Sequence, residues 1–402
     1  MKYSISTILL LLTFNLFSQV TGTNSTTNEP MNTAQNIISG NGGKITVSGY
    51  GQIDYNHQFA DSVRHNGLLD VHRLITFFGY QFAPKTFFVT EIEMEHVREL
   101  YVEQAFVQHN INPFLNFRAG LLLIPMGIVN EYHEPTTFNG VERPNIDGKI
   151  IPSTWREMGL GFSGKFDAAS LKYQLYLVNG FLSYNDNGEG KLRGIDGFRK
   201  GRQKGAESIL THPNLSTKID YYGIQGLKLG LAGYFGKSQS TAFEGLDINN
   251  ENNVSQADST VIGTSMVGLD FRYNNKGFQA RGQVIYANNS NVKAYNTFTG
   301  NDLGEEFFGY YIEAGYDVFR LLKKDLSLEL NLFARYENYD THHSVHSEMN
   351  QNLAFDRTDV TIGAGLRLAN GAVLKIDYQR FTNKDLNTAE KHQMNAGVAV
   401  WF

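Results

Sequence analysis

The chain has 402 residues, a formal net charge of −5 and no cysteine. The acidic balance excludes a basic surface for nucleic acid, and the lack of cysteine excludes disulfides, thiolate metal sites and cysteine nucleophiles. The 40 glycines, 28 phenylalanines and 21 tyrosines, beside only 8 prolines, favour strands and tight turns.

The first segment in chain order has the features of a secretion signal. Lys2 precedes an apolar stretch over 8–17, and small or polar residues follow at 18–23. About ten apolar residues are too few to cross a hydrocarbon core of about 30 Å as a helix. We therefore expect a signal peptide over residues 1–22. Residues 23–43 are polar and show no period, which predicts a flexible periplasmic leader.

From residue 44 to the end, apolar and polar residues alternate, as in strands with one apolar and one polar face. The segment at 101–110 fits poorly, because Glu103 and Gln104 place polar side chains in both phases. Bacterial membrane barrels have an even number of strands, and here we count sixteen segments. They lie near 45–55, 71–81, 85–95, 101–110, 115–123, 157–166, 170–181, 213–222, 226–236, 263–274, 277–287, 307–319, 326–338, 358–369, 372–381 and 392–402.

The connections between these segments alternate between short and long, with one exception near 96–100. Barrels of the outer membrane have short turns at one end and long loops at the other. After the signal segment no stretch reaches 18 uncharged apolar residues, so a closed barrel is the way left to span a membrane. The sequence therefore predicts an all-β fold, a transmembrane antiparallel β-barrel of about 16 strands over residues 44–402. Its last strand ends in Phe402, as such barrels commonly do.

The connection over residues 124–156 contains four of the eight prolines, which suppress regular structure. It also carries charges of both signs. A loop folded into the lumen at this point would narrow the channel and place a field across it. We expect such an inward-folded constriction loop; the alternative is an external cap over the rim. The charged residues are Glu131, Glu134, Glu142, Arg143, Asp147, Lys149 and Arg156.

In three stretches the sequence resembles the phosphate-selective porin O and P family as found in Bacteroidetes. These are GLLLIPMG at 120–127, VERP at 141–144 and IPSTWREMG at 151–159. The resemblance implies a sixteen-stranded, trimeric porin in the outer membrane of a Gram-negative bacterium, with an inward loop between strands five and six. It also implies anion selection by lumen arginines and lysines. The strand positions expected to face the lumen, however, carry basic and acidic residues in similar numbers. Two alternatives therefore stay open: an anion or phosphate preference, and a transverse field made by charges of both signs.

We therefore expect passive diffusion of small hydrophilic solutes and ions, with no catalytic residue, cofactor or metal. The expected partners are outer-membrane lipids, lipopolysaccharide and two further copies of the chain. The alternative is an enzyme or surface binding protein built on the same barrel. The candidate lumen residues are Arg118, Glu131, Glu142, Arg143, Lys149, Arg156 and Glu157 near the constriction, and Arg73, Glu91, Glu93, Arg335 and Arg367 elsewhere.

Two further motifs point weakly to other chemistry. Residues 159–164 match the G-x-G-x-x-G pattern of dinucleotide sites, but they lie within an alternating strand, without the helix that such a site needs. His342, His343, His346 and Glu348 could ligate a metal, but their spacing matches no structural zinc motif. We interpret this second group as part of a solvated loop.

Overall fold

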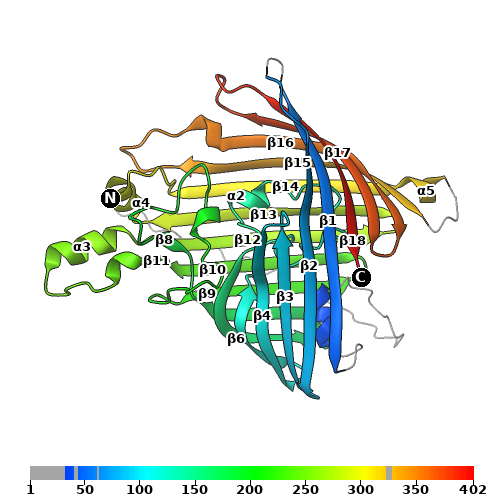
Figure 1. Ribbon diagram of the computed structural model, residues 1–402, viewed down its shortest axis with the longest axis horizontal. Coiled ribbons are helices and arrows are strands. Elements are labelled where there is room, and N and C mark those ends of the chain that lie inside the picture. Colours follow the sequence, from blue (N-terminus) through cyan, green and yellow to red (C-terminus); the bar gives the residue numbers. More distant parts are fainter. Residues whose placement is uncertain (1–31, 40–43, 61–62, 323–327) are drawn as a thin grey trace, which may run out of the picture. The chain divides into compact units, whose positions relative to one another are not determined.

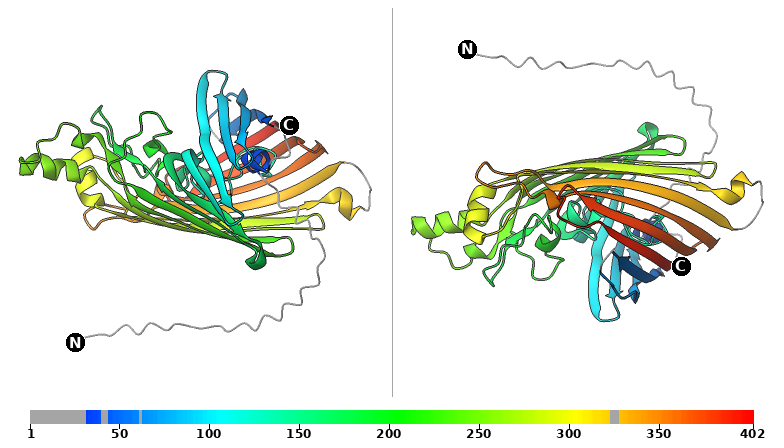
Figure 2. Two further views of the ribbon diagram at one scale, coloured as in Figure 1. Left: turned by 90° about the horizontal axis from the view of Figure 1, so that it is seen from below. Right: turned by 90° about the horizontal axis from the view of Figure 1, so that it is seen from above.

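The computed structural model describes residues 32–39, 44–60, 63–322 and 328–402. Within them, sixteen antiparallel strands form a closed barrel (Figures 1 and 2). The first and last strands pair with each other, Tyr50 opposite Trp401, so the sheet has no free edge. The predicted all-β barrel of sixteen strands is confirmed. The signal peptide expected over residues 1–22 lies outside the described residues.

The barrel strands are joined in chain order, each to the next. They are β1 (Ile45–Phe59), β2 (Leu68–Ala83), β3 (Thr86–Glu95), β4 (Glu99–Asn112), β5 (Leu115–Leu123), β6 (Arg156–Phe166), β7 (Leu171–Val178), β9 (Asn214–Ile224), β10 (Leu227–Lys237), β12 (Gly263–Asn275), β13 (Phe278–Ser290), β14 (Glu306–Asp317), β15 (Glu329–Ser344), β16 (Asp356–Ala369), β17 (Ala372–Asn383) and β18 (Lys391–Trp401).

The remaining elements lie in the connections and before β1. Two short strands outside the barrel, β8 (Leu182–Tyr184) and β11 (Gln239–Ser240), pair in parallel. The helices are α1 (Thr33–Ile38), α2 (Ile146–Lys149), α3 (Glu251–Ser259), α4 (Val292–Thr299) and α5 (Val318–Leu321), with single 3-10 turns η1 (Asp167–Ala169), η2 (Arg199–Gly201), η3 (Thr241–Phe243) and η4 (Leu353–Phe355). Among the described residues, no helix is long and apolar enough to cross a membrane.

The alternating pattern sorts side chains between the inside and the outside of the barrel. In β15, Arg335 and Glu337 are buried in the interior, whereas Tyr336 between them is 40% exposed on the outside. Successive side chains of a strand point to opposite faces, so polar residues line the lumen and apolar residues face outward. The barrel therefore has an apolar outer surface around a polar interior.

The poor fit of the segment at 101–110 has a structural cause. Glu91 of β3 pairs with Gln104 of β4, but its neighbour Ile92 pairs with Val102, so Glu103 is an extra residue in the ladder. Such a β-bulge shifts the phase of a strand by one residue. Glu103 and Gln104 consequently both point inward, exposed by 0% and 6%.

The connection between β5 and β6, residues 124–155, which we call L3, folds into the lumen. Its backbone is held by lumen side chains far away in sequence. The Nζ of Lys375 donates to the carbonyl oxygens of Phe138 and Gly140 at 2.6 and 2.8 Å, and the amide of Val141 donates to Asp377 at 2.6 Å. The predicted inward-folded loop is confirmed, and the alternative of an external cap is wrong.

The segment predicted as a flexible leader differs from that prediction at residues 33–38, which form α1. The side chain of Asn32 caps the helix, and the amide of Thr33 donates to Glu134 of L3 at 3.0 Å. Ile37 is buried against Gly79 of β2, where a Cβ atom would lie only 2.1 Å from Ile37 Cγ2. A six-residue helix is too short to be stable alone, so contacts with the barrel stabilise it.

Candidate functional site in the barrel lumen

A cavity of about 390 Å³ lies between L3, the wall formed by β1 to β4, and the connection between β7 and β9, residues 179–213, which we call L4. Its lining is almost entirely polar. We call it the first cavity. It is lined by Gln52, His72, Arg73, Glu93, Glu95, Glu99, Tyr101, Glu142, Arg143, Pro144, Asn145, Asp147, Gly148, Ser153, Thr154, Arg156, Arg199, Lys200, Arg202 and Lys204.

L4 contributes four of the cations of this cavity. Arg199 and Arg202 each donate to the carbonyl oxygen of Ser153 in L3, at 2.7 and 2.9 Å. Lys204 lies over the ring of Tyr101, 4.3 Å from its centroid. Within the part of the chain that the structure describes, none of these L4 cations has a carboxylate within 4.0 Å. Burial, and then the charges of Arg199 and Arg156, lower the pKa of Arg202 to about 9.

Five of the residues predicted from the sequence also line the first cavity: Arg73, Glu93, Glu142, Arg143 and Arg156. The L4 cations were missed, although four basic residues fall within the six residues at 199–204. That local run was the available signal. The run lies in a long connection, where no strand alternation indicates which side chains face the lumen. Its place in the lumen could therefore not be predicted from the sequence.

A second, smaller cavity of about 30 Å³ lies beside α1. Arg118 and Glu131 line it, so the structure does not place them with the other predicted constriction residues. Arg118 donates to Gln108 at 2.6 Å, and Glu131 forms an ion pair with Lys218 at 2.8 Å. The second cavity therefore holds charges that already have partners.

A fully buried polar layer connects the two cavities. Arg156 of the first cavity pairs with Glu103 at 3.5 Å; Nε2 of His133 lies 3.2 Å from Glu103 and 3.1 Å from Glu91; and Gln104 of the second cavity donates to Glu91 at 2.7 Å. Glu91 and Glu103 are 0% exposed and His133 is 2% exposed. In this conformation these three side chains are closed to solvent.

Four other predicted residues lie outside both cavities. Lys149 of L3 donates to the carbonyl oxygen of Ile195 in L4 at 3.0 Å. Glu157 is buried and accepts from Trp155, Gly180 and Tyr234. Arg335 is enclosed between two carboxylates, and Arg367 pairs with Glu329 at 3.1 Å near the short turns.

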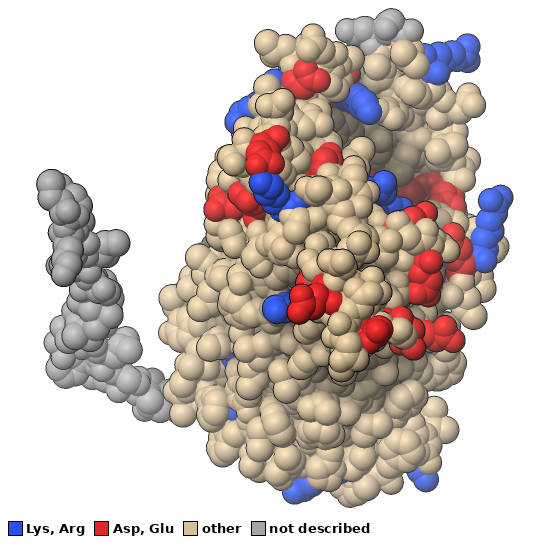
Figure 3. Space-filling view, turned by 90° about the vertical axis from the view of Figure 1, so that its left-hand side faces the viewer, with Lys and Arg blue, Asp and Glu red and all other residues tan. Residues whose placement is uncertain are grey.

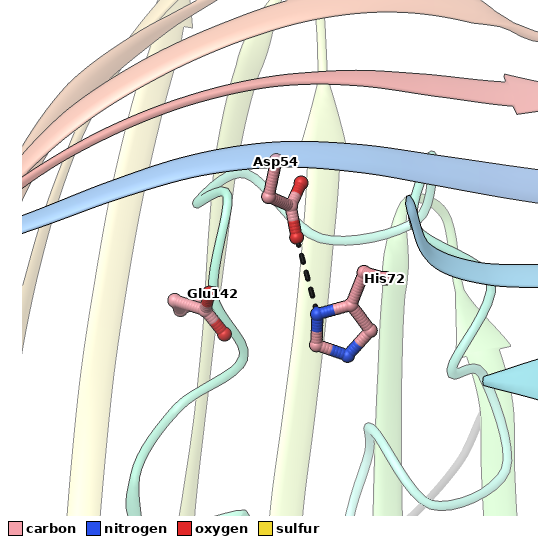
Figure 4. A group of neighbouring side chains, drawn as sticks. All are labelled: Asp54, His72 and Glu142. Carbon is pink, nitrogen blue, oxygen red and sulfur yellow. Dashed lines mark ion pairs between the residues drawn. The ribbon is translucent and has the colours of Figure 1, made fainter. Parts of the chain in front are cut away.

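The end of the barrel that carries the long loops has charged residues of both signs on its surface (Figure 3). The residues singled out as weak metal candidates do not converge there, and His342 and His343 belong to β15, so the interpretation of the whole group as a solvated loop is wrong for these two. His342 is buried with its Nε2 2.6 Å from the carbonyl oxygen of Asp302, and Glu348 pairs with Lys293. Among the described residues, the groups with metal-ligating potential are instead Asp54 with His72 and Glu142 (Figure 4), and Glu91 with Glu103 and His133.

Several solved structures share the barrel fold of this chain. The outer membrane channel DcaP of Acinetobacter baumannii is 11% identical, with a TM-score of 0.58, over 89% of this chain and 97% of that chain. OmpF of Salmonella typhi, in complex with daunomycin, is 12% identical, with a TM-score of 0.56, over 90% and 98%. An anion-selective porin from Comamonas acidovorans is 14% identical, with a TM-score of 0.52, over 89% and 99%. At these identities the likeness concerns the fold.

A relative at the sequence level is an uncharacterized protein of Aquifex aeolicus. It is 31% identical over 359 residues, which cover 85% of this chain and 76% of that protein. No protein-family model matches the chain, so the resemblance to phosphate-selective porins is supported only as far as the porin fold. By its extent and identity, the match shows that the chain belongs to the family of this Aquifex aeolicus protein.

Proposed function

We propose that the chain is an outer-membrane channel for passive diffusion of small hydrophilic solutes, with a preference for anions. The first cavity carries the proposal. It is lined by seven lysines and arginines against five carboxylic acids. Burial raises the pKa of Asp147 to about 7, which reduces the negative charge of the lining near neutral pH. A small anion would therefore meet a net positive field.

The outer surface supports placement in a Gram-negative outer membrane. Apolar side chains cover the outside of the strands, and aromatic side chains gather near both ends. Phe114 and Phe166 stack at the short-turn end, with ring centroids 5.8 Å apart, and Phe59 lies over His392 at the long-loop end, 5.6 Å away. Aromatic girdles on both sides of an apolar band are typical of outer-membrane barrels. The long loops would face the exterior.

The decisive measurement is the reversal potential of the purified protein in planar bilayers under a salt gradient. We expect anion selectivity in the native chain and a several-fold lower anion-to-cation permeability ratio in Arg199→Gln/Arg202→Gln. Lys276→Gln/Arg320→Gln removes the same charge at exposed positions of the short-turn end and serves as the control. A reversal potential that both double variants leave unchanged would reject the role of the L4 cations.

The buried layer at Glu91, Glu103 and His133 is the observation that favours a second candidate. If L3 never moves away from the barrel wall, the barrel would conduct nothing. It would then serve as an outer-membrane enzyme or surface binding protein with the first cavity as its site. Single-channel recording separates the two functions directly. Discrete current steps support the channel, whereas their complete absence after verified insertion supports the second candidate.

The assembly and processing expected from the family resemblance are proposals as well. We propose a homotrimer, whose interface would cover part of the apolar outer surface. Sedimentation in density-matched detergent should give three times the protomer mass. The mature chain should begin after residue 22, which amino-terminal sequencing of protein from outer membranes would test. A monomer, or an uncleaved amino terminus, would reject the respective proposal.

A further inference from the structure

Three potential metal ligands from distant parts of the chain meet on the wall of the first cavity. Asp54 comes from β1, His72 from β2 and Glu142 from L3, and Figure 4 shows Glu142 on the L3 backbone, next to the other two side chains. Each offers one ligand atom, and these atoms all lie within 4.8 Å of one another. Nδ1 of His72 lies 3.2 Å from Oδ2 of Asp54. The barrel closure and the inward loop are both needed to bring them together.

The cluster contains more negative than positive charge. Among the described residues, neither Asp54 nor Glu142 forms an ion pair with a lysine or arginine. Glu142 accepts a hydrogen bond from the neutral side chain of Asn56 at 2.8 Å. Two carboxylates that share only one imidazole favour a further cation between them.

A second, independent observation is a pair of buried oxygen atoms beside the cluster. Asp54 is 2% exposed and Gln52 is 4% exposed. Oδ1 of Asp54 and Oε1 of Gln52 are both buried, and neither has a hydrogen-bond partner among the described residues. Gln52 donates from Nε2 to Asp54 at 2.7 Å, which fixes its amide next to the carboxylate. Buried acceptors without donors are costly unless a cation or water satisfies them.

The cluster is also within reach of ions from the long-loop end. Gln52, His72 and Glu142 line the first cavity. His96, which is exposed, has its ring 5.4 Å from that of His72 and pairs through Nδ1 with Asp70. A cation could therefore enter through the cavity and leave by the same route.

We propose that Asp54, His72 and Glu142 bind one divalent transition-metal cation, of the class of Zn²⁺, Ni²⁺ or Cu²⁺. Two carboxylates and a neutral imidazole balance the charge of such an ion. Imidazole nitrogen favours these metals over Mg²⁺ and Ca²⁺, which prefer sets of oxygen ligands. Because the ligands come from β1, β2 and L3, the cation would tie the inward loop to the barrel wall. This site is independent of whether the barrel conducts.

Titration calorimetry with Ni²⁺ on the complete folded protein in detergent tests the site. We expect binding of one ion per chain near neutral pH. Loss of a residue that only hydrogen-bonds to a metal ligand typically weakens metal binding about 10- to 100-fold. His72→Ala removes a ligand itself and should therefore weaken Ni²⁺ binding at least about tenfold. His343→Ala removes an exposed histidine of β15 and should leave binding unchanged. With Cu²⁺, electron paramagnetic resonance should show nitrogen coupling that His72→Ala removes.

A protonated His72 that only bridges the two carboxylates is the competing arrangement. His72→Gln keeps a hydrogen-bond donor for Asp54 and lacks the imidazole, so it distinguishes the metal site from this bridging arrangement. It also serves as the second variant if His72→Ala fails to fold. Weak Ni²⁺ binding in folded His72→Gln supports the site. A native chain that binds no Ni²⁺, or binding equal in His72→Gln and the native chain, overturns the proposal. Neither result depends on channel currents.

Discussion

At the scale of single residues, most charges in the lumen neutralise one another, and this explains why the two signs occur in similar numbers. Lys218 lies 2.8 Å from Glu131 and 3.2 Å from Asp270. Arg335 lies 3.3 Å from Glu313 and is paired with a second carboxylate as well. Such pairs hold the loop and the wall together. The charges left to act on a solute include those of L4 and that of Arg143 in L3.

Arg335 provides a test of this structural role. It is 1% exposed, and Arg335→Met would leave Glu337 buried without its paired cation, whereas Glu313 would keep its ion pair with Arg281. Removing one partner of a buried ion pair costs about 3 to 5 kcal/mol. We expect the free energy of unfolding in detergent, measured by denaturant titration, to fall by about that amount.

The matched control for Arg335→Met is Arg367→Met. Arg367 pairs with Glu329 at the barrel end, where both side chains are substantially exposed. Exposed pairs contribute less than about 1 kcal/mol, so this variant should unfold almost like the native chain. Equal losses in the two variants would show that Arg335 has no special role inside the barrel.

At the scale of elements, L3 and α1 decide how much of the lumen is open. Both are held by groups that the strands supply. His133 of L3 lies between Glu91 and Glu103, and Ile37 of α1 packs against Gly79. Neither element has enough regular structure to hold its shape alone. Their positions can therefore be changed without breaking the barrel.

The pH dependence of L3 follows from His133. Burial opposes the charged imidazole, but Glu91 and Glu103 outweigh it and hold the pKa of His133 well above its ordinary value. Stabilisation from a raised pKa is complete below the unfolded value of about 6.5, falls steadily as pH rises above that value and is fully lost above the folded value. Protection of the L3 amides, calculated from exchange rates corrected for intrinsic rates, should therefore be constant below about pH 6 and fall by up to about tenfold per pH unit above about pH 6.5. Protection that does not change between about pH 5 and pH 8 would show an imidazole without a shifted pKa.

The docking of α1 is tested by Gly79→Ala. The added Cβ would lie 2.1 Å from Ile37 Cγ2, a distance at which one of the two must move. Overpacking costs about 1 to 3 kcal/mol, so amide exchange over residues 33–38 should accelerate at least about fivefold. Gly365→Ala is the control, because its Cβ would meet Val373 at an ordinary 3.7 Å. Unchanged exchange in Gly79→Ala would contradict the docking.

At the scale of the whole molecule, the fold depends on closure between the two ends of the sheet. β18 pairs with β1 and with β17, and the backbones of Gly49 and Phe402 exchange hydrogen bonds of 3.0 and 2.9 Å. Without β18 both neighbours would present unpaired edges under an apolar outer surface, which favours aggregation. Closure is therefore expected to be a condition of folding.

Removal of residues 391–402 tests that condition. We expect the shortened chain to aggregate and to fail to insert into liposomes, as followed by flotation and far-ultraviolet dichroism. The control replaces residues 245–256, a stretch of the same length at the exposed α3, with a short Gly-Ser linker and should insert normally. Normal insertion of the chain without β18 would contradict the requirement.

The sequence by itself determined the barrel, its sixteen strands and the loop between the fifth and sixth. Strand periodicity and connection length are local properties, so they can be read along the chain. The tertiary structure alone decided the inward turn of Glu103, the docking of α1, the place of the L4 cations and the meeting of Asp54, His72 and Glu142. These depend on register, on space left by glycines and on contacts between residues far apart in sequence. No local pattern encodes them, because each is set by the element on the other side of the contact.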